Sequence, residues 1–309
     1  MKIKIIIPYY GRLPYNFPFW LKSCEYNKNI DFMLVTDIEI TQKMPKNIQV
    51  IRITFGNLKL LIEQKLNRKV ILTKPYKLCD YKPLYGFIFE DYLKNYDYWG
   101  YCDMDMIFGD LECFFEKYCL SNYDKFLKYG HLSLYKNIDK INKLFYKSEN
   151  FNKIFESEST YGFDEENGIN DVFYKEKLSF FDKTIFADIT PRLNRFCLSF
   201  SEKNYKYQLF YKENHKIFKI FYDNKIFKTK EYIYIHYQKR LVKNIDVDLD
   251  NDKKYSISCK GFSKIEGEIN LKMIKKLNPY RGFILEFFER YISRFKQYLN
   301  KKRRTYEKN

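Results

Sequence analysis

Short apolar runs rich in β-branched residues alternate, in the first hundred residues, with stretches where apolar residues recur every three or four positions. The short runs predict strands at residues 3–7, 32–37, 48–53 and 98–102. The longer spacing predicts helices at residues 17–26 and 58–66, and a third that opens at residues 79–84 and ends near residue 95. This order is typical of an α/β fold in which helices flank a mixed, mostly parallel sheet.

The stretch from Tyr98 to Leu111 places two carboxylates, Asp103 and Asp105, directly after an apolar and aromatic run. Burying an ionised carboxylate is costly unless a cation or a hydrogen-bond donor compensates it. On extended backbone, residues i and i+2 point the same way, so both side chains can address one ligand. Mg²⁺-type ions take carboxylates together with substrate phosphates. The pair therefore predicts a divalent-metal site or, alternatively, a polar strand end that caps the next helix.

Other polar residues follow the predicted strands, and ligands of open α/β sheets bind beyond the carboxyl ends of strands. After the first strand, Tyr9 and Tyr10 can stack on a base and Arg12 can meet a phosphate, but a surface turn with packed tyrosines explains them equally well. Asp37 after the second strand can bind a ribose hydroxyl or a base edge, although a cap is the simpler explanation.

Two further candidates, Asp80 and Lys82, lie at the opening of the third predicted helix, where an anion is favoured. Capping alone also accounts for Asp80. His131 belongs to a short strand predicted at residues 130–135, and it is either a substrate contact or a packed histidine. A helix is predicted to follow over residues 138–155.

The most acidic stretch of this basic chain runs over residues 161–171 and is punctuated by glycines, which predicts a loop leading into a helix. Asp164, Glu165 and Glu166 are the candidates in it for a group that takes a proton from an acceptor hydroxyl or orients it. A solvated loop is the alternative.

After residue 205 the pattern changes to short strand-like runs, with a hairpin turn predicted at Asp223-Asn224. A later strand, residues 232–240, ends in His236, Lys239 and Arg240. A neutral imidazole is a good additional ligand for Mn²⁺ or Mg²⁺. The two cations can neutralise a leaving diphosphate.

The C-terminal part combines a polar segment, predicted to be irregular over residues 242–268, with a helix over residues 283–299. Residues 271–309 contain 12 Lys and Arg against 3 Asp and Glu, a net charge of +9, so the first 270 residues carry 17 − 9 = +8. A basic helix with an apolar stripe is typical of contact with an anionic membrane surface. Packing on the preceding domain, with a solvated tail, is the alternative.

The composition sets broad limits. With 45% apolar and 20% aromatic residues the chain is not disordered, and its net charge of +17 favours anionic partners. The apolar run at the N-terminus is too short for a signal peptide or a membrane span. The seven cysteines are scattered and form no C-x-x-C pair, which fits a reducing cytoplasm rather than a disulfide framework or a zinc site.

Six segments together resemble bacterial GT-A-fold glycosyltransferases of the Asp-x-Asp type, most closely a poorly characterised family associated with capsule, lipopolysaccharide and other surface-glycan genes. The segments are residues 5–11, 35–37, 80–83, 99–105, 130–131 and 235–240. The resemblance implies a GT-A-like, Rossmann-related catalytic domain over residues 1–241. Its nucleotide-binding half would cover residues 1–111 and its acceptor-side half residues 112–241, with residues 242–309 as the polar segment and helical tail.

The resemblance also implies a UDP- or GDP-linked sugar donor bound through Mn²⁺ or Mg²⁺. Asp103 and Asp105 would hold the metal, with Asp103 touching the donor, and His236 would complete the metal shell. Pro8, Tyr9 and Asp37 would hold the nucleoside. The acceptor would be a glycan or lipid-linked, and the C-terminal His ligand favours retention of configuration. We expect an enzyme of the cytoplasm, peripheral on the inner face of the membrane.

Two rival functions use the same features. A metal-dependent nucleotidyltransferase also uses paired carboxylates on a sheet, but the chain has no G-x-x-x-x-G-K-[ST] loop. A non-catalytic nucleic-acid-binding protein would fit the charge of +17, yet the motif region is acidic and the excess charge is terminal, so no specific nucleic acid is expected.

Overall fold

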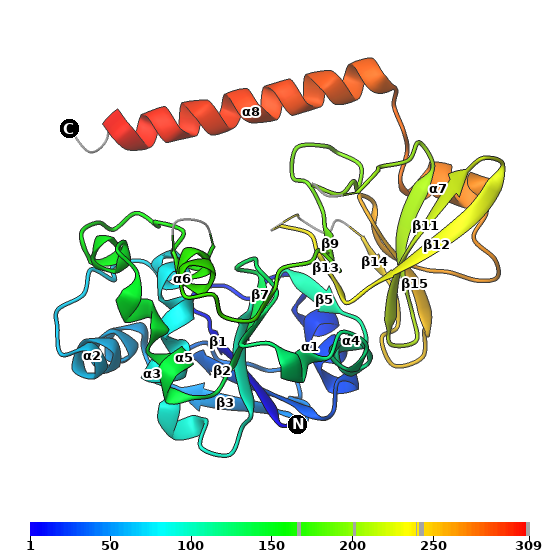
Figure 1. Ribbon diagram of the computed structural model, residues 1–309. Coiled ribbons are helices and arrows are strands. Elements are labelled where there is room, and N and C mark those ends of the chain that lie inside the picture. Colours follow the sequence, from blue (N-terminus) through cyan, green and yellow to red (C-terminus); the bar gives the residue numbers. More distant parts are fainter. Residues whose placement is uncertain (166–167, 200–201, 239, 241–243, 307–309) are drawn as a thin grey trace. The chain divides into compact units, whose positions relative to one another are not determined.

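The computed structural model describes residues 1–165, 168–199, 202–238, 240 and 244–306. The chain forms two compact units (Figure 1). Unit 1 contains residues 1–104 and 111–184, and unit 2 contains residues 105–110 and 185–309. The division differs from the boundary we expected at residue 241. The strand that carries His236 pairs with strands at residues 106–108 and 187–188, so residues 185–240 fold with the C-terminal part.

Unit 1 is built on a seven-stranded sheet with the order β3-β2-β1-β4-β7-β6-β8. Its strands are β1 (Ile3–Pro8), β2 (Ile30–Thr36), β3 (Ile48–Arg52), β4 (Tyr98–Cys102), β6 (Lys125–Phe126), β7 (Leu132–Lys136) and β8 (Phe180–Phe181). β3, β2, β1 and β4 run parallel to one another, and β7 is antiparallel to both β4 and β6. The mixed, mostly parallel α/β sheet is the predicted one.

Helices cover both faces of this sheet (Figure 1). One side carries α1 (Phe17–Tyr26) and α4 (Leu111–Lys117), and the other α2 (Phe55–Leu66), α3 (Tyr85–Ile88), α5 (Asp139–Asn142) and α6 (Ile169–Lys175). Thr54 caps the start of α2, and its hydroxyl accepts a hydrogen bond from the Asn57 amide at 3.2 Å. The helix ends at Asn67, which adopts the left-handed conformation at φ 49°.

Two predicted helices are broken into shorter pieces. Residues 75–84 form the 3₁₀ helix η1 (Pro75–Leu84), followed by the four-residue α3 and by η2 (Glu90–Tyr92). Pro83 lies inside η1 and has no amide hydrogen to donate, which disfavours a continuous α-helix. The helix expected over residues 138–155 is instead α5, η4 (Leu144–Lys147) and η5 (Phe151–Phe155). A further 3₁₀ turn, η3, covers Leu120–Asn122.

The core of unit 1 is strongly aromatic. Trp99 on β4 stacks on Tyr135 of β7 with ring centroids 4.6 Å apart, and its indole donates to Asn142 Oδ1 at 2.7 Å. Large aromatic side chains bury much apolar area, and their polar atoms need partners. This packing fixes β4, and with it the position of Asp103 directly after the strand.

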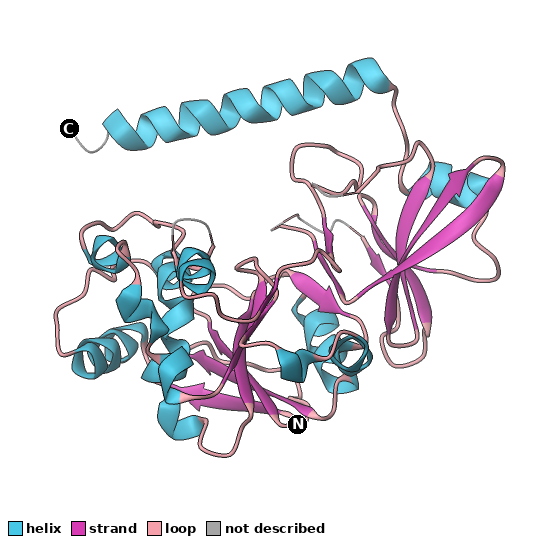
Figure 2. Ribbon diagram, in the orientation of Figure 1, coloured by secondary structure: helices cyan, strands magenta, loops and turns pink. Residues whose placement is uncertain are grey.

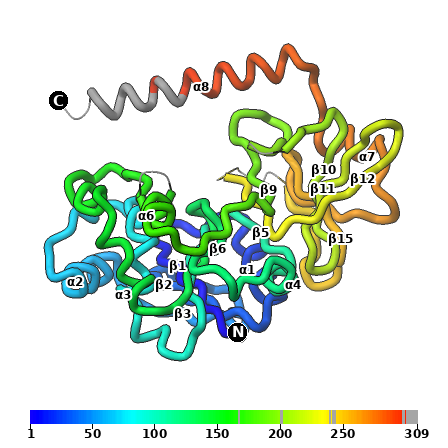
Figure 3. The backbone as a smooth tube through the Cα atoms, in the orientation of Figure 1, coloured from blue at the N-terminus to red at the C-terminus, as the bar shows by residue number. Residues whose placement is uncertain are grey.

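Unit 2 is rich in strands (Figure 2) and contains two sheets. The three-stranded sheet has the order β5 (Met106–Phe108), β13 (Tyr234–His236), β9 (Ala187–Asp188). The six-stranded sheet consists, in order, of β12 (Ile226–Tyr232), β11 (Lys216–Asp223), β10 (Gln208–Glu213), β15 (Lys254–Ser258), β16 (Gly261–Lys264) and β14 (Ile245–Asp246). The chain path through these strands can be followed in Figure 3.

The predicted hairpin is confirmed as β11 and β12, with Asp223 paired to Ile226 and positive φ at both Asn224 and Lys225. Two such residues in a two-residue loop match the twist of the strands. The irregular segment expected at residues 242–268 is instead β14, β15 and β16. The helix α7 (Leu271–Leu277) packs Ile274 and Leu277 into an apolar cluster with residues of β10 and β11.

The last element, α8 (Phe283–Tyr306), exposes the apolar side chains of its first four turns, with Phe283 77% and Ile284 69% exposed. No described helix is long and apolar enough to span a membrane. Among the described residues, none of the seven cysteines takes part in a disulfide.

Candidate metal and donor site

The carboxyl ends of three parallel strands gather sequence-predicted residues in unit 1. β1 pairs with β2 through Pro8 and Val35, and with β4 through Ile6 and Tyr101. Neighbouring parallel strands end at the same edge of a sheet. Tyr9, Asp37 and Asp103, which follow β1, β2 and β4, therefore share the edge at which α/β sheets bind ligands.

Lys82 connects Asp103 to the acidic loop. Its Nζ lies 2.8 Å from Asp103 Oδ1, 2.8 Å from the Gly130 carbonyl oxygen and 3.5 Å from Asp164 Oδ2. Burial alone would lower the pKa of this ammonium, but the attraction of Asp103 and Asp164 outweighs burial and raises the pKa well above its ordinary value. Lys82 is therefore a permanent positive charge. The Asp103 side chain remains 34% exposed.

The acidic loop is docked against β7 rather than solvated. Glu165 Oε1 accepts a hydrogen bond from the Gly130 amide at 3.0 Å. A Cβ at residue 130 would lie 2.3 Å from Asp164 Oδ2, so any larger residue there would displace the Asp164 carboxylate. Asp164 is buried, and desolvation raises the pKa of its carboxyl to about 7, against the lowering effect of Lys82. Glu166 lies outside the described residues.

Asp80, which we expected to contact the donor, has a different environment. Its carboxylate is fully buried, lies 2.8 Å from Lys77 Nζ, and accepts hydrogen bonds from the backbone amides of residues 161, 162 and 163. Asp80 is also more than a helix cap, because it lies inside η1 and its partners are in a distant segment. Asp80 leaves no surface for a ligand, and its contacts instead fix the segment that leads to Asp164.

The β1 loop shows a similar division between accessible and enclosed groups. Arg12 is exposed, and Tyr9, half-buried, donates its hydroxyl to the Arg12 carbonyl oxygen at 3.0 Å. Tyr10 is buried against Phe55 with ring centroids 5.2 Å apart, and its hydroxyl has no hydrogen-bond partner among the described residues. Desolvation raises the pKa of Tyr10. Asp37 is exposed, and its Oδ2 accepts from the first amide of α2, at Phe55, at 3.4 Å.

In unit 2, three strands bring two carboxylates to His236. Antiparallel pairing sets His236 opposite Met106, one residue after Asp105, and parallel pairing sets it opposite Asp188. Asp105 and His236 are 236 − 105 = 131 positions apart in the sequence. Strand pairing nevertheless places His236 Nε2 3.3 Å from Asp105 Oδ1. The Tyr237 amide also donates to the Asp105 carbonyl oxygen at 3.1 Å.

Asp188 determines which nitrogen of His236 is available. Its Oδ1 lies 2.8 Å from Nδ1 of His236, and Gln238 Nε2 donates to both Asp188 oxygens at 2.9 and 3.0 Å. A carboxylate that accepts from Nδ1–H directs the lone pair of Nε2 toward a metal. One partly buried carboxylate and one oriented, buried imidazole lie side by side and fit a divalent cation such as Mn²⁺.

Four candidates remain: Pro8, His131, Lys239 and Arg240. Arg240 places its guanidinium against backbone carbonyl oxygens of residues 190, 193 and 194, and Lys239 lies outside the described residues. Pro8 ends β1 and is half-buried. His131 is buried, with its ring parallel to that of Tyr129 at 5.7 Å.

Sequence reasoning did not find Asp188, Gln238 and Lys77. Asp188 lies in a two-residue strand, too short to give a periodic signal, and its importance depends on pairing with a strand 48 residues away. Lys77 has one usable signal, because it precedes Asp80 by three residues, the spacing of an ion pair on a helix.

Comparison with known proteins shows the family. The chain belongs to a family of unknown function, DUF6625, whose model matches residues 5–266. No curated protein matches the chain.

Several solved glycosyltransferase structures are distantly similar. Galactosyltransferase LgtC, in complex with donor and acceptor sugar analogues, is 10% identical over 61% of this chain and 76% of its own, with a TM-score of 0.37. The apo glycosyltransferase GlyE of Streptococcus pneumoniae TIGR4 is 16% identical over 59% and 45%, with a TM-score of 0.33. Mouse xyloside xylosyltransferase 1 is 8% identical over 61% and 87%, with a TM-score of 0.34. Similarities this distant carry no argument about activity.

Proposed function

We propose that this protein is a metal-dependent glycosyltransferase that moves a sugar from a nucleotide-sugar donor to a glycan or lipid-linked acceptor. The observation that carries the proposal is the group formed by Asp105, His236 and Asp188. In this group Asp188 orients the His236 imidazole toward Asp105, which is the last residue of the sequence Asp103-Met104-Asp105. A metal-binding pair joined by two peptide units to the carboxyl edge of a parallel sheet suits a ligand that carries both a nucleoside and a diphosphate.

In this proposal Asp105 and His236 hold Mn²⁺ or Mg²⁺, and Asp103 joins them because it is only two residues from Asp105. The ion would supply positive charge for a departing diphosphate. Lys82 keeps Asp103 in place and adds a second positive charge. Tyr9, Arg12 and Asp37 are the accessible groups for the nucleoside at the same edge of unit 1.

On the acceptor side, Asp164 and Glu165 are the described carboxylates. We propose that the reaction retains configuration, as the resemblance through His236 implies, with Asp164 and Glu165 positioning the acceptor. A carboxyl whose pKa is about 7 also suits a general base. The anomeric configuration of the product, measured by NMR, decides between retention and inversion. An inverted product would contradict retention and assign the role of general base to Asp164.

For location, we propose a peripheral association with the inner face of the cytoplasmic membrane and a role in bacterial surface-glycan synthesis. The exposed apolar residues of α8, together with the net charge of +9 over residues 271–309, support an anionic membrane surface as partner. Sedimentation with vesicles that contain anionic lipid, compared with purely zwitterionic vesicles, tests it. Equal sedimentation with both would contradict it.

The central experiment measures thermal stability with UDP or GDP and Mn²⁺, followed by hydrolysis of a panel of nucleotide sugars. We expect a Mn²⁺-dependent rise in melting temperature that Asp105→Ala abolishes, with at least a 100-fold loss of donor hydrolysis. The exposed carboxylate Asp171, substituted by Ala, is the matched control and should leave both signals unchanged. Binding of oligonucleotides in place of nucleotide sugars, or release of pyrophosphate from a nucleoside triphosphate, would contradict the proposal in favour of the rival functions.

A further inference from the structure

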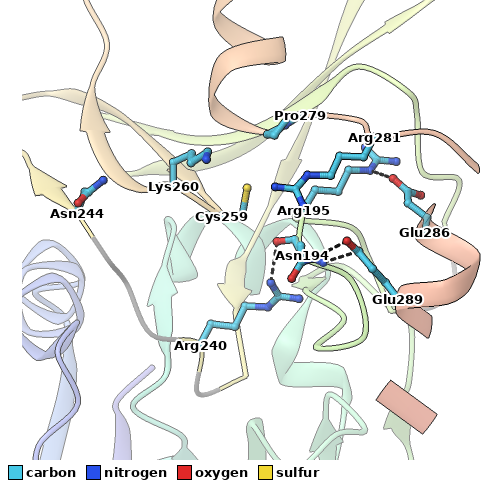
Figure 4. Close-up of a pocket in the computed structure, with 10 residues that line it drawn as sticks. All are labelled: Asn194, Arg195, Arg240, Asn244, Cys259, Lys260, Pro279, Arg281, Glu286 and Glu289. Atoms are coloured by element: carbon cyan, nitrogen blue, oxygen red, sulfur yellow. Dashed lines mark hydrogen bonds and ion pairs between the residues drawn. The ribbon is translucent and has the colours of Figure 1, made fainter. Parts of the chain in front are cut away.

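Unit 2 contains a cavity of about 730 Å³ (Figure 4) whose lining shares no residue with the Asp105–His236–Asp188 group. Cavities that bind small molecules are commonly of this size. The lining carries four cationic side chains, Arg195, Arg240, Lys260 and Arg281, and two carboxylates, Glu286 and Glu289. Its formal charge is therefore 4 − 2 = +2.

Both carboxylates already have partners. Glu286 forms an ion pair with Arg195, and Glu289 accepts hydrogen bonds from the backbone amide and side chain of Asn194. In the described part of the chain, no ion pair forms at Arg240, Lys260 or Arg281. Three cations thus converge on one cavity without a paired carboxylate, and such a group favours an anion.

Arg240 is the most constrained of the three. Its two terminal nitrogens donate to backbone carbonyl oxygens of residues 190, 193 and 194, and its guanidinium lies 5.0 Å from the Phe196 ring centroid. Its Nε is buried and has no hydrogen-bond partner among the described residues. A buried donor without a partner is costly, and a ligand oxygen would satisfy it. Lys260 and Arg281 are exposed and can close on a ligand from outside.

An apolar surface begins beside these cations. The helix α8 starts at Phe283, two residues after Arg281, and its first two turns supply both lining carboxylates. The same turns expose Phe283, Ile284, Phe287 and Phe288. A cationic cavity and an exposed apolar helix on one element match a ligand with a phosphate head and a hydrocarbon chain.

We propose that this cavity binds the phosphate of a lipid-linked phosphate, with Arg240, Lys260 and Arg281 around the phosphate and the first turns of α8 against the lipid chain. Arginine and lysine are the usual phosphate-binding side chains. The binding itself does not depend on the proposed transferase activity. Only the identification of this ligand as the acceptor rests on that function.

The test is isothermal titration calorimetry of the full chain in EDTA with dodecyl phosphate below its micelle concentration. The comparison ligands are inorganic phosphate and the neutral dodecyl maltoside. We expect dodecyl phosphate to bind at least tenfold more tightly than either. The double variant Lys260→Gln/Arg281→Gln, in which both changes are at exposed positions, should weaken binding at least tenfold, whereas the control Lys272→Gln/Arg294→Gln should not change it.

Four results would overturn parts of the proposal. Unchanged affinity in the double cavity variant removes the site. Equal affinity for inorganic phosphate keeps the anion site but rejects a lipid as its source, and equal affinity for dodecyl maltoside rejects recognition of the phosphate. Asp105→Ala separates this inference from the proposed function: it should bind dodecyl phosphate normally while losing Mn²⁺-dependent nucleotide binding. Loss of dodecyl phosphate binding in Asp105→Ala would assign the phosphate to the metal site instead.

Discussion

Two lysine–aspartate pairs of unit 1 have the same 2.8 Å separation and opposite surroundings. In the Lys77–Asp80 pair both side chains are almost completely buried, and backbone amides occupy the remaining oxygen positions of Asp80. In the Lys82–Asp103 pair, Lys82 is nearly buried but a third of the Asp103 side chain is exposed. The distance within an ion pair therefore does not reveal its role. What distinguishes the two is whether the carboxylate has an oxygen left for a ligand, and on that basis Asp80 is structural and Asp103 is available.

The largest effect is expected from removing Asp80, the carboxylate that has no oxygen left for a ligand. Asp80→Ala leaves the Lys77 ammonium buried without its counter-charge and three backbone amides without an acceptor. We expect a loss of about 3–5 kcal/mol in the free energy of unfolding, measured in urea. Asp91→Ala, at an exposed ion pair, is the control and should cost far less, because solvent screens such pairs. A comparably small loss in Asp80→Ala would contradict the structural role.

Asp103, which has an oxygen available for a ligand, should affect activity more than stability. Asp103→Asn keeps an oxygen that Lys82 can donate to but removes the charge that a divalent cation requires. We expect at least a 100-fold loss of Mn²⁺-dependent donor hydrolysis. The loss in the free energy of unfolding should be smaller than in Asp80→Ala, because Lys82 keeps the Gly130 carbonyl oxygen and Asp164 as partners. Steady-state kinetics and urea unfolding on the same preparation measure the two effects. A variant that retains full activity would show that Asp103 is not a metal ligand.

The strands at the centre of this comparison could be predicted from sequence, and most of their surroundings could not. The short β-branched or aromatic runs of β1, β2, β3 and β4 stand out in the sequence, so the parallel half of the sheet was correctly predicted, with Asp103 directly after β4. The 3₁₀ helix η1 was not, because its short turns depend on Pro83 and on the buried Lys77–Asp80 pair.

The same limit applies to the site. A metal shell shared by Asp105 and His236 requires their side chains to lie close together, and strand pairing between β5 and β13 places His236 Nε2 3.3 Å from Asp105 Oδ1. Asp188 could not be found in advance, since its partner is fixed by tertiary pairing and a lone aspartate carries no pattern. Three-dimensional pairing, rather than local periodicity, thus supplies the residues that orient the candidate ligands.

Asp188, in unit 2, is a buried carboxylate of a third kind, because it would act on a metal ion indirectly, by orienting His236. Asp188→Asn keeps the shape but weakens the hydrogen bond that orients His236 Nδ1. We expect Mn²⁺ affinity to fall 10- to 100-fold, the usual effect of removing a carboxylate behind a metal-binding histidine. Titration of Mn²⁺ followed by electron paramagnetic resonance measures this. Ser199→Ala removes only a long contact to Gln238, at 3.4 Å, and is the control. Unchanged Mn²⁺ affinity in Asp188→Asn would show that His236 is not a ligand.

The smallest expected effect concerns Asp164. It is buried like Asp80, but it lies near the same lysine as Asp103, with its Oδ2 3.5 Å from Lys82 Nζ. Its pKa is raised to about 7 in the folded chain, whereas an unfolded chain has the ordinary value of 3.8. Between these values the folded state holds a proton that the unfolded state has released, so folding loses stability as pH rises. From pH 5 to pH 7 this loss should be about 2 kcal/mol.

Asp164→Asn removes the titrating group, so its free energy of unfolding should lack this decline and should gain on that of the wild type as the pH rises. Urea unfolding at intervals between pH 5 and pH 8, without metal, measures the difference. Asp171→Asn, at an exposed position seven residues along, should leave the slope as it is in the wild type. If Asp164→Asn and the wild type run parallel across this range, Asp164 has an ordinary pKa. The attraction of Lys82 would then offset the desolvation of Asp164.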